Sequence, residues 1–557
     1  MMKNTGLANL LFPDVHLSRK DIIAKYPARQ LNGAAKVTRF APSPTGFLTI
    51  GGLYATFISE RLAHQSGGVF YLRIEDTDKK REVEGSIEGI VQALDYFGIH
   101  YDEGVTSAGE TGDYGPYKQS DRAEIYRVFI KHLVEQNLAY PCFCDTETLQ
   151  DIRNAQQSHN EMTGYYGKWA IHRSFTLEQV QEELAKGKPF VVRLKSPDSL
   201  EHKIRYTDLV KGDIELPEND QDIVIMKADG IPTYHFAHAV DDFLMGTTHV
   251  IRGDEWLSSI PIHVQLFEML GFKRPEYGHL APIMKMDGQS KRKFSKRKDP
   301  DAAVHYYQQE GYPREAITEY FMTLVNSNYE EWRMQHPTEP FSSFSIDTSK
   351  MNVSGPLFDM DKLHDISKNV IAQMNEAEVF EQVAKWAQMY HSELYQQIIN
   401  QREYTVRILG IGKDTVKPRK DFAKWSDIPA AIAYFFDEAY EADACDVSES
   451  LPAAAPLPIA QQIVQAYLEI YNTPDDREIW FDKMKQVADQ FGFAKDTKAY
   501  KKQPEHYKGH VGDVAMVLRL ALSKRAHTPD LYDMMQVMGE SRVRSRLSLF
   551  THMVRNG

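Results

Sequence analysis

The stretch Val37–Gly52 reads VTRFAPSPTGFLTIGG and decides how the chain is organised. A short apolar run is followed by two prolines that stiffen the path, and Gly46 turns it. Gly51 and Gly52 then open a helical pattern, so the stretch predicts a strand, a loop and a helix that starts with glycine. Small residues at a helix N-terminus let a phosphate approach unpaired backbone N–H groups. Because this connection is also ordinary in α/β domains, the stretch alone leaves nucleotide binding open.

Strand and helix patterns alternate over residues 37–117. Val69–Glu75 is a short β-branched and aromatic run, and Glu84–Ile99 has apolar residues at helical spacing. This alternation predicts a doubly wound parallel sheet of Rossmann type. Ligands of such sheets bind at the carboxyl ends of the strands, so we expect Phe40–Gly46 and Glu75–Asp78 to face one pocket.

The rest of the chain changes character twice. Residues from about Tyr140 to Met226 interrupt the sheet pattern, which resumes in Thr233–Leu257. From about Pro300 amphipathic helical runs dominate, and Leu451–Pro458 predicts a linker among them. We therefore predict an α/β doubly wound domain with an inserted α+β domain and an all-α C-terminal half.

Bulk properties narrow the class of protein. A chain of 557 residues is too long to fold around one hydrophobic core, and its length indicates about three to five domains. No run can span a bilayer and the N-terminus lacks a secretion signal, so we expect a cytoplasmic protein without a membrane partner. The three cysteines, Cys142, Cys144 and Cys445, do not make a disulfide framework. The net charge of −13 argues only weakly against nucleic acid, because a local basic surface matters more than the total.

Four motifs in order resemble a known family. They are the opening stretch, LRIEDTDKKR at Leu72–Arg81, the stretch Asp229–Leu257, and KFSKRKD at Lys293–Asp299. Together they resemble the bacterial glutamyl-tRNA synthetases, which are class I aminoacyl-tRNA synthetases. The resemblance implies that ATP activates L-glutamate to glutamyl-adenylate, which is transferred to the 3′ end of tRNA(Glu). It implies ATP, Mg²⁺, glutamate and tRNA(Glu) as ligands of a monomer.

The resemblance also implies a division of labour along the chain. It assigns 1–35 to an N-terminal extension, 36–139 and 228–300 to the two halves of the catalytic domain, 140–227 to the insertion that holds the tRNA acceptor end, 301–385 to a helical stem-contact domain and 386–557 to a helical anticodon-binding domain. A strand-rich C-terminal end would instead have indicated glutaminyl or eukaryotic glutamyl enzymes.

The expected glutamate pocket needs a cation for each carboxylate and an acceptor for the ammonium. Arg39 and Arg252 are the expected cations, because a guanidinium grips a carboxylate through two parallel hydrogen bonds. Glu75 is the expected ammonium partner, although an Arg39–Glu75 salt bridge is the structural alternative. Arg252 would reject neutral glutamine, which leaves its charge unpaired. The resemblance adds Ala41, Ser43, Tyr234, His238 and Trp256, with His238 standing where a smaller amide or hydroxyl is expected.

The basic segment Ser290–Asp299 carries six cations between Lys291 and Lys298. It reads either as a solvated charge run, or as a mobile loop that neutralises a triphosphate. KFSKR matches the second class I signature, which implies that Lys296 contacts the leaving pyrophosphate, while Mg²⁺ binds chiefly through ATP. The implied catalytic positions are Lys296, Thr49, Gly51 and Gly52, and the implied ATP-binding positions are Pro42, Pro44, Thr45, Gly46, Ile50, Lys293, Phe294, Ser295, Lys296 and Arg297.

Thr49 departs from the family pattern. The first signature usually reads His-Ile-Gly-His or His-Ile-Gly-Gly, whereas this chain has TIGG. The expected histidine hydrogen-bonds the phosphates as the transition state forms, and loss of one such donor lowers the rate by ~10²–10³. Three explanations of Thr49 stay open. A neighbouring residue supplies the missing hydrogen bond, the enzyme is slow, or the residue was changed deliberately.

Two further groups of residues receive no assigned role. Some family members bind zinc near Cys142 and Cys144, and this chain adds Tyr165, Tyr166 and His172, with Trp169 near the expected place of a further cysteine. Because two thiolates and one histidine are an incomplete structural set, the alternative is two plain thiols, and we assign no metal ligand. Arg542, Arg544 and Arg546 could contact RNA phosphates or end a solvated helix.

Two other functions remain as rivals. One is a relative that glutamylates a modified base in tRNA, but it lacks the helical C-terminal half. The other is a non-catalytic or slow tRNA-binding paralogue, suggested by Thr49 alone. No motif that we can place indicates whether tRNA(Gln) is also charged.

Overall fold

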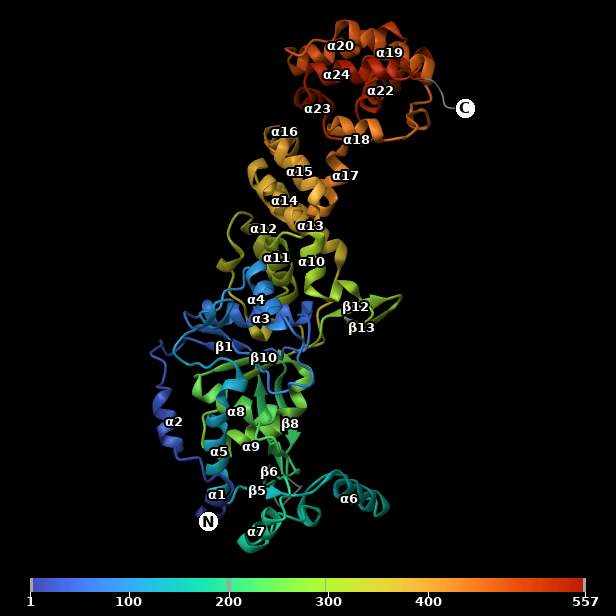
Figure 1. Cartoon of the computed structure of the whole chain (residues 1–557). Coiled ribbons are helices and arrows are strands. Elements are labelled where there is room, and N and C mark those ends of the chain that lie inside the picture. The colour runs from blue at the N-terminus through green and yellow to red at the C-terminus, as the bar shows by residue number, and fades with distance from the viewer. Residues whose placement is uncertain (1–3, 198–201, 296, 554–557) are drawn as a thin grey trace. The chain divides into compact units, whose positions relative to one another are not determined.

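The computed structural model describes residues 4–197, 202–295 and 297–553. The chain divides into two compact units, one formed by Met1–Gln308 with Ile317–Met360 and the other by Gln309–Ala316 with Asp361–Gly557 (Figure 1). The domain boundaries expected within these units stay predictions.

A layer of mostly parallel strands, made of two adjoining sheets, forms the centre of the first unit. Its strands are β1 (Val37–Phe40), β2 (Val69–Leu72), β3 (Glu103–Thr106), β4 (Gly109–Thr111), β10 (His249–Gly253) and β11 (Glu276–Leu280). Strands β1, β2 and β3 are parallel neighbours with β4 as an antiparallel edge, and β10 pairs in parallel with β11. The Thr248 N–H donates to the Val37 carbonyl at 2.9 Å, so β10 begins beside β1. The strand order therefore reverses between β1 and β10, which is where doubly wound sheets bind ligands.

Helices cover both faces of this sheet, as predicted. They are α3 (Ile50–His64), α4 (Ser86–Tyr96), α5 (Ala123–Glu135), α8 (Tyr234–Leu244) and α9 (Ile260–Leu270). Figure 1 shows α3 and α4 on one side of β1 and β10 and α8 and α9 on the other. The strand–loop–helix expected at the opening stretch is β1 followed by α3. Gly46 has a φ of +129°, a conformation that side chains rarely adopt, which explains glycine at the turn.

The interrupting segment is α+β in character, as predicted. It contains the antiparallel sheet β5–β6–β9 and the hairpin β7–β8. Its elements are β5 (Ala139–Cys142), α6 (Thr146–Ser158), α7 (Leu177–Ala185), β6 (Val191–Leu194), β7 (Lys203–Asp208), β8 (Gly212–Pro217) and β9 (Val224–Met226). Its role in holding the tRNA acceptor end stays a prediction.

The N-terminal residues dock on the first unit through two short helices, α1 (Thr5–Leu11) and α2 (Arg19–Lys25). Leu7 and Leu11 are buried in a cluster that includes Phe129 of α5. An exposed salt bridge joins Asp14 to Arg127 on the same helix. These residues therefore pack against α5, and their assignment as a separate extension stays a prediction.

The first four residues of the basic segment form a strand rather than a loop. Ser290–Lys293 forms β13, which pairs in antiparallel register with β12 (Met284–Asp287). Arg292 binds Asp287 and grips Asp299 through both terminal nitrogens at 2.7 Å. The interpretation of Ser290–Lys293 as part of a loop is wrong, because these residues pair with β12 and Arg292 is neutralised by Asp287 and Asp299.

The second unit is all-α, as predicted. Helices α10 (Val304–Glu310) and α11 (Arg314–Val325) straddle the unit boundaries, and α12 (Tyr329–Gln335) belongs to the first unit. The remaining helices are α13 (Met360–Gln373), α14 (Glu376–Tyr390), α15 (Ser392–Asn400), α16 (Arg402–Leu409), α17 (Ile428–Ile432), α18 (Asp437–Ala442), α19 (Leu457–Ile470), α20 (Arg477–Gln490), α21 (Thr497–Lys502), α22 (Val511–Ser523), α23 (Leu531–Met538) and α24 (Glu540–Thr551). The predicted linker leads directly into α19 and buries Ala455, so it is a packed connection.

Candidate active site

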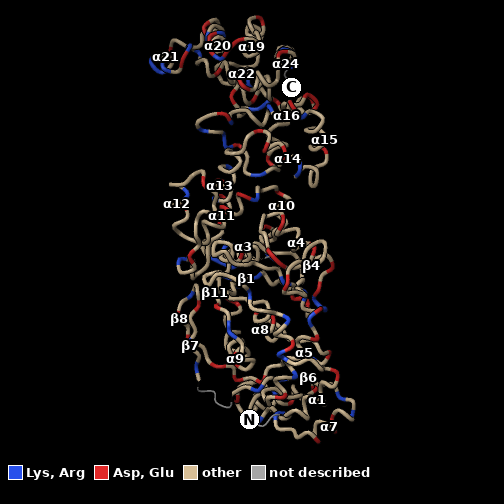
Figure 2. Tube along the Cα trace, turned by 90° about the vertical axis from the view of Figure 1, so that its left-hand side faces the viewer, with Lys and Arg blue, Asp and Glu red and all other residues tan. Residues whose placement is uncertain are grey.

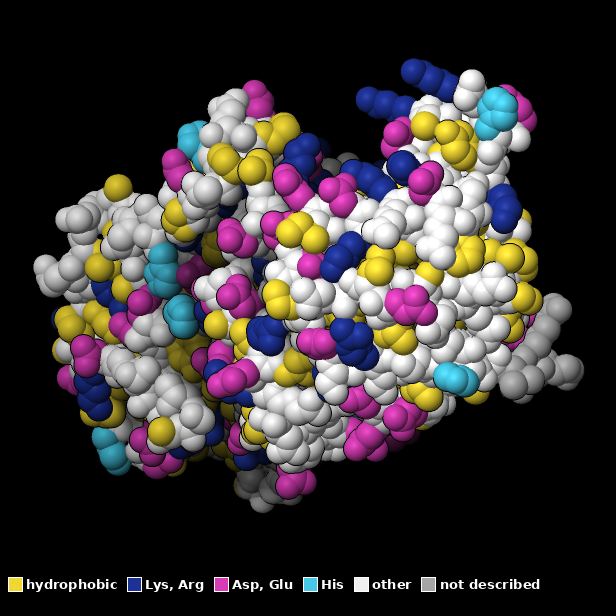
Figure 3. Space-filling model, turned by 90° about the horizontal axis from the view of Figure 1, so that it is seen from above, with side chains coloured by type: hydrophobic (Ala, Val, Ile, Leu, Met, Phe, Trp, Pro, Cys, Tyr) yellow, Lys and Arg dark blue, Asp and Glu magenta, His cyan; other side chains and the backbone are white. Residues whose placement is uncertain are grey.

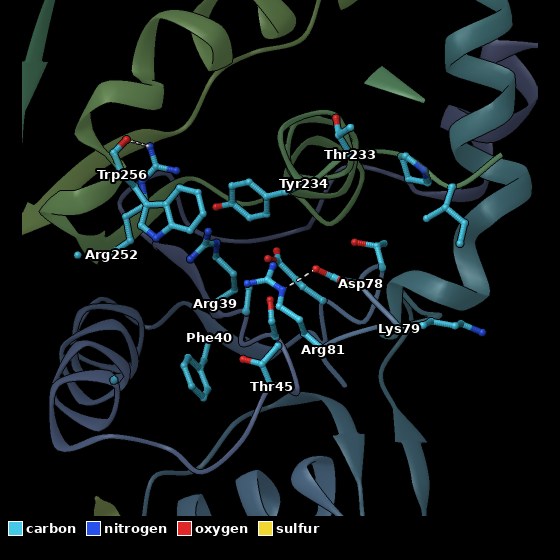
Figure 4. Close-up of a pocket in the computed structure, with 18 of the residues that line it drawn as sticks. Arg39, Phe40, Thr45, Asp78, Lys79, Arg81, Thr233, Tyr234, Arg252 and Trp256 are labelled. Carbon is cyan, nitrogen blue, oxygen red and sulfur yellow. Dashed lines mark hydrogen bonds and ion pairs between the residues drawn. The ribbon is translucent and has the colours of Figure 1, made fainter. Parts of the chain in front are cut away.

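A cavity of about 950 Å³ opens at the carboxyl ends of β1 and β10. Arg39 comes from the end of β1 and Arg252 from the end of β10, and both line the cavity (Figure 4). Glu75 follows β2 and lines it as well. The structure therefore brings together, at the switch point of the sheet, the two cations and the carboxylate that the sequence selects.

Arg39 belongs to a buried network of charges. Its Nε lies 3.5 Å from Asp242 Oδ2, and Asp242 also accepts from Arg73 Nη1 at 2.6 Å. Arg73 in turn donates to Glu75 at 2.9 Å, so the expected alternative of a direct Arg39–Glu75 salt bridge is replaced by an Arg73–Glu75 pair. Burial raises the pKa of Glu75, although Arg73 and Arg39 oppose the shift. Burial lowers the pKa of Arg39, but Asp242, Tyr234 and Glu75 together outweigh it and the net shift is upward.

Arg252 is held differently. Its side chain is buried, its Nε donates to His279 Nε2 at 3.0 Å, and one terminal nitrogen approaches His263 Nδ1 at 3.3 Å. The other terminal nitrogen, Nη1, is buried without a hydrogen-bond partner. Among the described residues no carboxylate forms an ion pair with Arg252. A buried, uncompensated guanidinium at a cavity wall is a receptor for an anion, because a buried charge without a partner is costly.

Aromatic rings form the wall between these groups. The rings of Tyr234 and Trp256 lie 4.5 Å apart and both line the cavity. His238 does not line it, since its side chain is fully buried behind Tyr234. Its Nδ1 lies 3.1 Å from Asp242, and its Nε2 is 2.9 Å from the Tyr277 hydroxyl. His238 was expected in the pocket, but in this structure it supports the pocket wall from behind through these contacts.

The opening loop contributes some of its expected residues. Ala41, Ser43, Thr45 and Gly52 line the cavity. The expected positions that do not line it are Pro42, Pro44, Gly46, Thr49, Ile50 and Gly51. The Pro42 carbonyl accepts from the Glu75 N–H at 2.9 Å, which ties the loop to the end of β2.

Thr49 is the N-cap of α3. Its side-chain oxygen accepts from the Gly52 N–H at 3.0 Å, which satisfies one of the free donors of the first turn. Thr49 thus uses an acceptor site to start the helix, and its hydroxyl proton is left for another partner. A Cβ on Gly52 would lie 2.9 Å from a Leu48 methyl carbon, the end of a side chain that can move aside.

The expected phosphate contacts of the basic segment lie outside this cavity. Lys293, Phe294, Ser295 and Arg297 are not among its lining residues. Phe294 is buried against Phe358, and the Ser295 N–H donates to Asp299 at 3.0 Å. Lys296 lies outside the described residues, so its expected contact with pyrophosphate stays a prediction.

Sequence reasoning missed a cationic part of the cavity. Lys79, Lys80 and Arg81, which follow β2, line it together with Lys227. Lys227 donates to the Thr77 carbonyl at 2.9 Å, which ties the end of the insertion to the same loop. These cations belong to the second quoted motif, and their place after a parallel strand was the signal that could have found them.

A thiol–histidine cluster lies in the inserted segment. The ligand atoms of Cys142, Cys144 and His172 all lie within 4.8 Å of one another. The Tyr165 hydroxyl lies 3.4 Å from Cys142 Sγ and 3.3 Å from His172 Nδ1. A hydrogen bond from Cys144, opposed by burial and aided by His172, lowers the pKa of Cys142 to about 3.

Two neighbours of this cluster are engaged elsewhere. The Tyr166 hydroxyl donates to the Met162 carbonyl, and Trp169 donates to Glu161. The cluster therefore offers two sulfurs and one imidazole, which are three donors of the kinds that zinc binds, with the Tyr165 hydroxyl beside them.

The C-terminal arginines serve the fold. Arg546 is buried and binds the Leu522 carbonyl and Asp437, while Arg542 pairs with Asp437 and Arg544 with Glu540. The alternative of a solvated helix end is wrong for Arg546, and its burial removes it from any surface that binds RNA. Figure 2 shows Lys and Arg gathered at α21, and Figure 3 shows basic and acidic side chains interspersed over the face drawn.

Comparisons with known proteins agree with this architecture. The family model described as "tRNA synthetases class I (E and Q), catalytic domain" matches residues 36–365, and the model described as "Anticodon binding domain" matches 378–550. The chain belongs to the class I tRNA synthetases. The family named from four motifs is thereby confirmed, together with the Rossmann-like sheet and the helical C-terminal half.

Relatives of this synthetase match it over nearly its full length. A glutamate–tRNA ligase from Clostridium perfringens (strain SM101 / Type A) is 48% identical over 99% of this chain and 100% of the relative. Another from Acetivibrio thermocellus is 49% identical over 97% and 98% of the two chains. The crystal structure of a glutamate tRNA ligase from Elizabethkingia meningosepticum, in complex with its amino acid, has a TM-score of 0.75 at 27% identity over 93% and 100%. Among the described helices of this synthetase, none has the length and apolar character needed to cross a membrane.

Proposed function

We propose that this synthetase is a glutamate–tRNA ligase that uses ATP to activate L-glutamate and transfers it to tRNA(Glu). The observation that carries the proposal is the meeting of Arg39, Arg252 and Glu75 in one cavity at the switch point. Two guanidinium groups and one carboxylate match the two carboxylates and the ammonium of glutamate. The full-length relatives named glutamate–tRNA ligase support the same assignment.

Arg252 selects the side-chain carboxylate in this proposal. Its Nη1 is buried without a partner, so a neutral glutamine amide would leave the charge uncompensated. Glu75 faces the ammonium, and Arg39 holds the second carboxylate near the start of α3. Tyr234 and Trp256 close the pocket with apolar area that excludes water.

The first step joins a glutamate carboxylate oxygen to the α-phosphorus of ATP and releases pyrophosphate. Positioning and charge neutralisation do most of the catalysis, and none of the cysteines needs to act as a nucleophile. Thr49 and the first turn of α3 face the phosphates, Lys296 contacts the leaving group, and Mg²⁺ arrives with ATP. The terminal ribose hydroxyl of tRNA then takes the glutamyl group and AMP leaves.

Pyrophosphate exchange into ATP tests the proposal and separates it from its rivals. We expect exchange that depends on glutamate, measured with and without tRNA, and little exchange with glutamine. A chain that binds tRNA without exchange under both conditions would be the non-catalytic paralogue. Charging of purified tRNA(Glu) and tRNA(Gln) then decides the tRNA specificity, while a monomeric state and a cytoplasmic location remain predictions for sizing and fractionation.

A further inference from the structure

A second layer of buried polar groups stands behind Arg252. His279, on β11, lies with Nε2 3.0 Å from Arg252 Nε and Nδ1 2.6 Å from Asp208 Oδ2. All three side chains are buried, and neither His279 nor Asp208 lines the cavity. The chain Asp208–His279–Arg252 therefore reaches the pocket only through the guanidinium.

Asp208 is itself held in one orientation. It is the last residue of β7, and its Oδ1 accepts the backbone N–H groups of Val210, Lys211 and His279 at 2.9–3.1 Å. Its Oδ2 is therefore the oxygen that faces His279, and the Tyr206 hydroxyl donates to that oxygen at 3.1 Å. Three converging N–H donors fix a carboxylate far better than one contact would.

This arrangement decides the tautomer of His279. Asp208 is an acceptor, so His279 must carry its proton on Nδ1 and present the lone pair of Nε2 to the Arg252 Nε–H. Burial lowers the pKa of His279, although Asp208 opposes the shift, which is consistent with a neutral ring. Arg252 is thus held by its Nε edge, and its Nη1 is left for a ligand.

We propose that Asp208 and His279 are positioning residues that orient Arg252 for the side-chain carboxylate of the substrate. The inference rests on the proposed function and deepens it, since it assigns glutamate selection in part to the base of the β7–β8 hairpin. Two contacts fix the base of the hairpin beside β10 and β11. The Leu209 N–H donates to the Tyr277 carbonyl, and Lys211 pairs with Asp254. Neither Asp208 nor His279 touches the substrate.

Two substitutions of His279 separate positioning from folding. His279→Gln keeps an acceptor at the place of Nε2, whereas His279→Asn keeps a partner for Asp208 and removes the acceptor for Arg252. Loss of one hydrogen bond to a charged group corresponds to about 10–100-fold. We expect His279→Asn to raise the KM for glutamate by about that factor, with the KM for ATP and kcat nearly unchanged, and His279→Gln to recover most of the loss.

Asp208→Asn tests the other end of the chain. The three N–H donors keep the amide oxygen at Oδ1, so the amide NH₂ faces His279 and places the imidazole proton on Nε2. Two donors then oppose each other at Arg252, and we expect the same rise in the KM for glutamate. His64→Asn is the matched control, because His64 also contacts carboxylates, those of Glu60 and Asp102, but does not line the cavity.

The readouts are pyrophosphate exchange kinetics, glutamate binding by calorimetry and thermal unfolding of each full-length variant. Equal effects of His279→Asn and His279→Gln on the KM for glutamate would overturn the inference, as would equal losses for glutamate and ATP. Absence of exchange by the wild type would reject the proposed function instead. Calorimetry then still compares the variants, and a wild type that fails to bind glutamate overturns both proposals.

Discussion

Arg39 Nε lies 3.5 Å from Asp242 Oδ2, and both side chains are buried. Arg252 shares the cavity but forms no ion pair with a carboxylate among the described residues, and its Nη1 has no hydrogen-bond partner. One guanidinium is thus partly compensated by the protein, and the other awaits an anion. This difference separates a guanidinium that the fold already pairs in part from one whose charge is left entirely to the substrate.

Arg252→Gln should abolish glutamate activation without unfolding the protein. The variant loses the charge that pairs with the substrate, so we expect the KM for glutamate to rise at least 100-fold, on the order of a charged hydrogen-bond pair. Removal of an unpaired buried charge should leave the free energy of unfolding equal or higher. Exchange kinetics and thermal unfolding check both expectations, and a large drop in Tm would show that Arg252 is structural.

Arg73→Gln is the matched comparison, since Arg73 is also a fully buried guanidinium. It pairs with Asp242 at 2.6 Å and with Glu75 at 2.9 Å, so its loss leaves buried Glu75 without its ion-pair partner and Asp242 with the longer Arg39 contact. Breaking such a pair costs about 3–5 kcal/mol. We expect a clear loss of stability in chemical denaturation, and unchanged stability would contradict the described network.

Thr49→His should raise the rate of adenylate formation, because it restores a phosphate donor that the family usually has. The same change removes the hydroxyl that caps α3 through the Gly52 N–H, which costs about 1 kcal/mol. We therefore expect faster exchange and a slightly lower Tm. Thr49→Ser keeps the cap and should change neither value. An unchanged or lower rate in Thr49→His would show that Thr49 is adapted to its site.

The sequence predicted the architecture well because periodicity and strand–loop–helix order are local. Arg39 and Arg252 could be placed in one pocket because parallel strands end at one edge. The network of buried charges around Arg39 could not be predicted, because the sequence pattern does not indicate that Arg73 rather than Arg39 pairs with Glu75. The buried position of His238 could not be predicted either, because its Nε2 contacts Tyr277, which is distant in sequence. The β13 strand was hidden by its lysines, which are typical of exposed loops.

The thiol–histidine cluster should hold one zinc ion in protein prepared without chelator. The two sulfurs, His172 Nδ1 and the Tyr165 hydroxyl lie close enough to share one tetrahedral ion. Metal analysis should find zinc near one equivalent, and chelator should lower Tm. Cys144→Ser should lose the metal. The exposed Cys445→Ser is the control that keeps it. Full-length protein without metal, and a Tm unaffected by chelator, would indicate two plain thiols.

Stability should fall as pH drops below neutrality, because the first unit buries neutral histidines. Burial lowers the pKa values of His238, His263 and His279 below the ordinary 6.5, with Arg252 adding to the effect at each. As pH falls through 6.5, the unfolded chain takes up protons that the folded chain refuses, so the free energy of unfolding decreases. Each histidine contributes a slope of about 1.4 kcal/mol per pH unit between 6.5 and its folded pKa.

This pH effect can be assigned to a single residue with His238→Asn, which places an amide where the family pattern expects a smaller side chain. The variant removes one titrating group, so the slope of unfolding free energy against pH should decrease by about 1.4 kcal/mol per unit.

Glu75 acts in the opposite sense, because burial raises its pKa and the folded state binds a proton more readily at acid pH. Chemical denaturation between pH 8 and about 5.5, where histidine uptake dominates, isolates the histidine effect. A wild-type slope near zero over that range would mean that these imidazoles are protonated in the folded protein, which the contacts of His238 with Tyr277 and of His263 with Arg252 oppose.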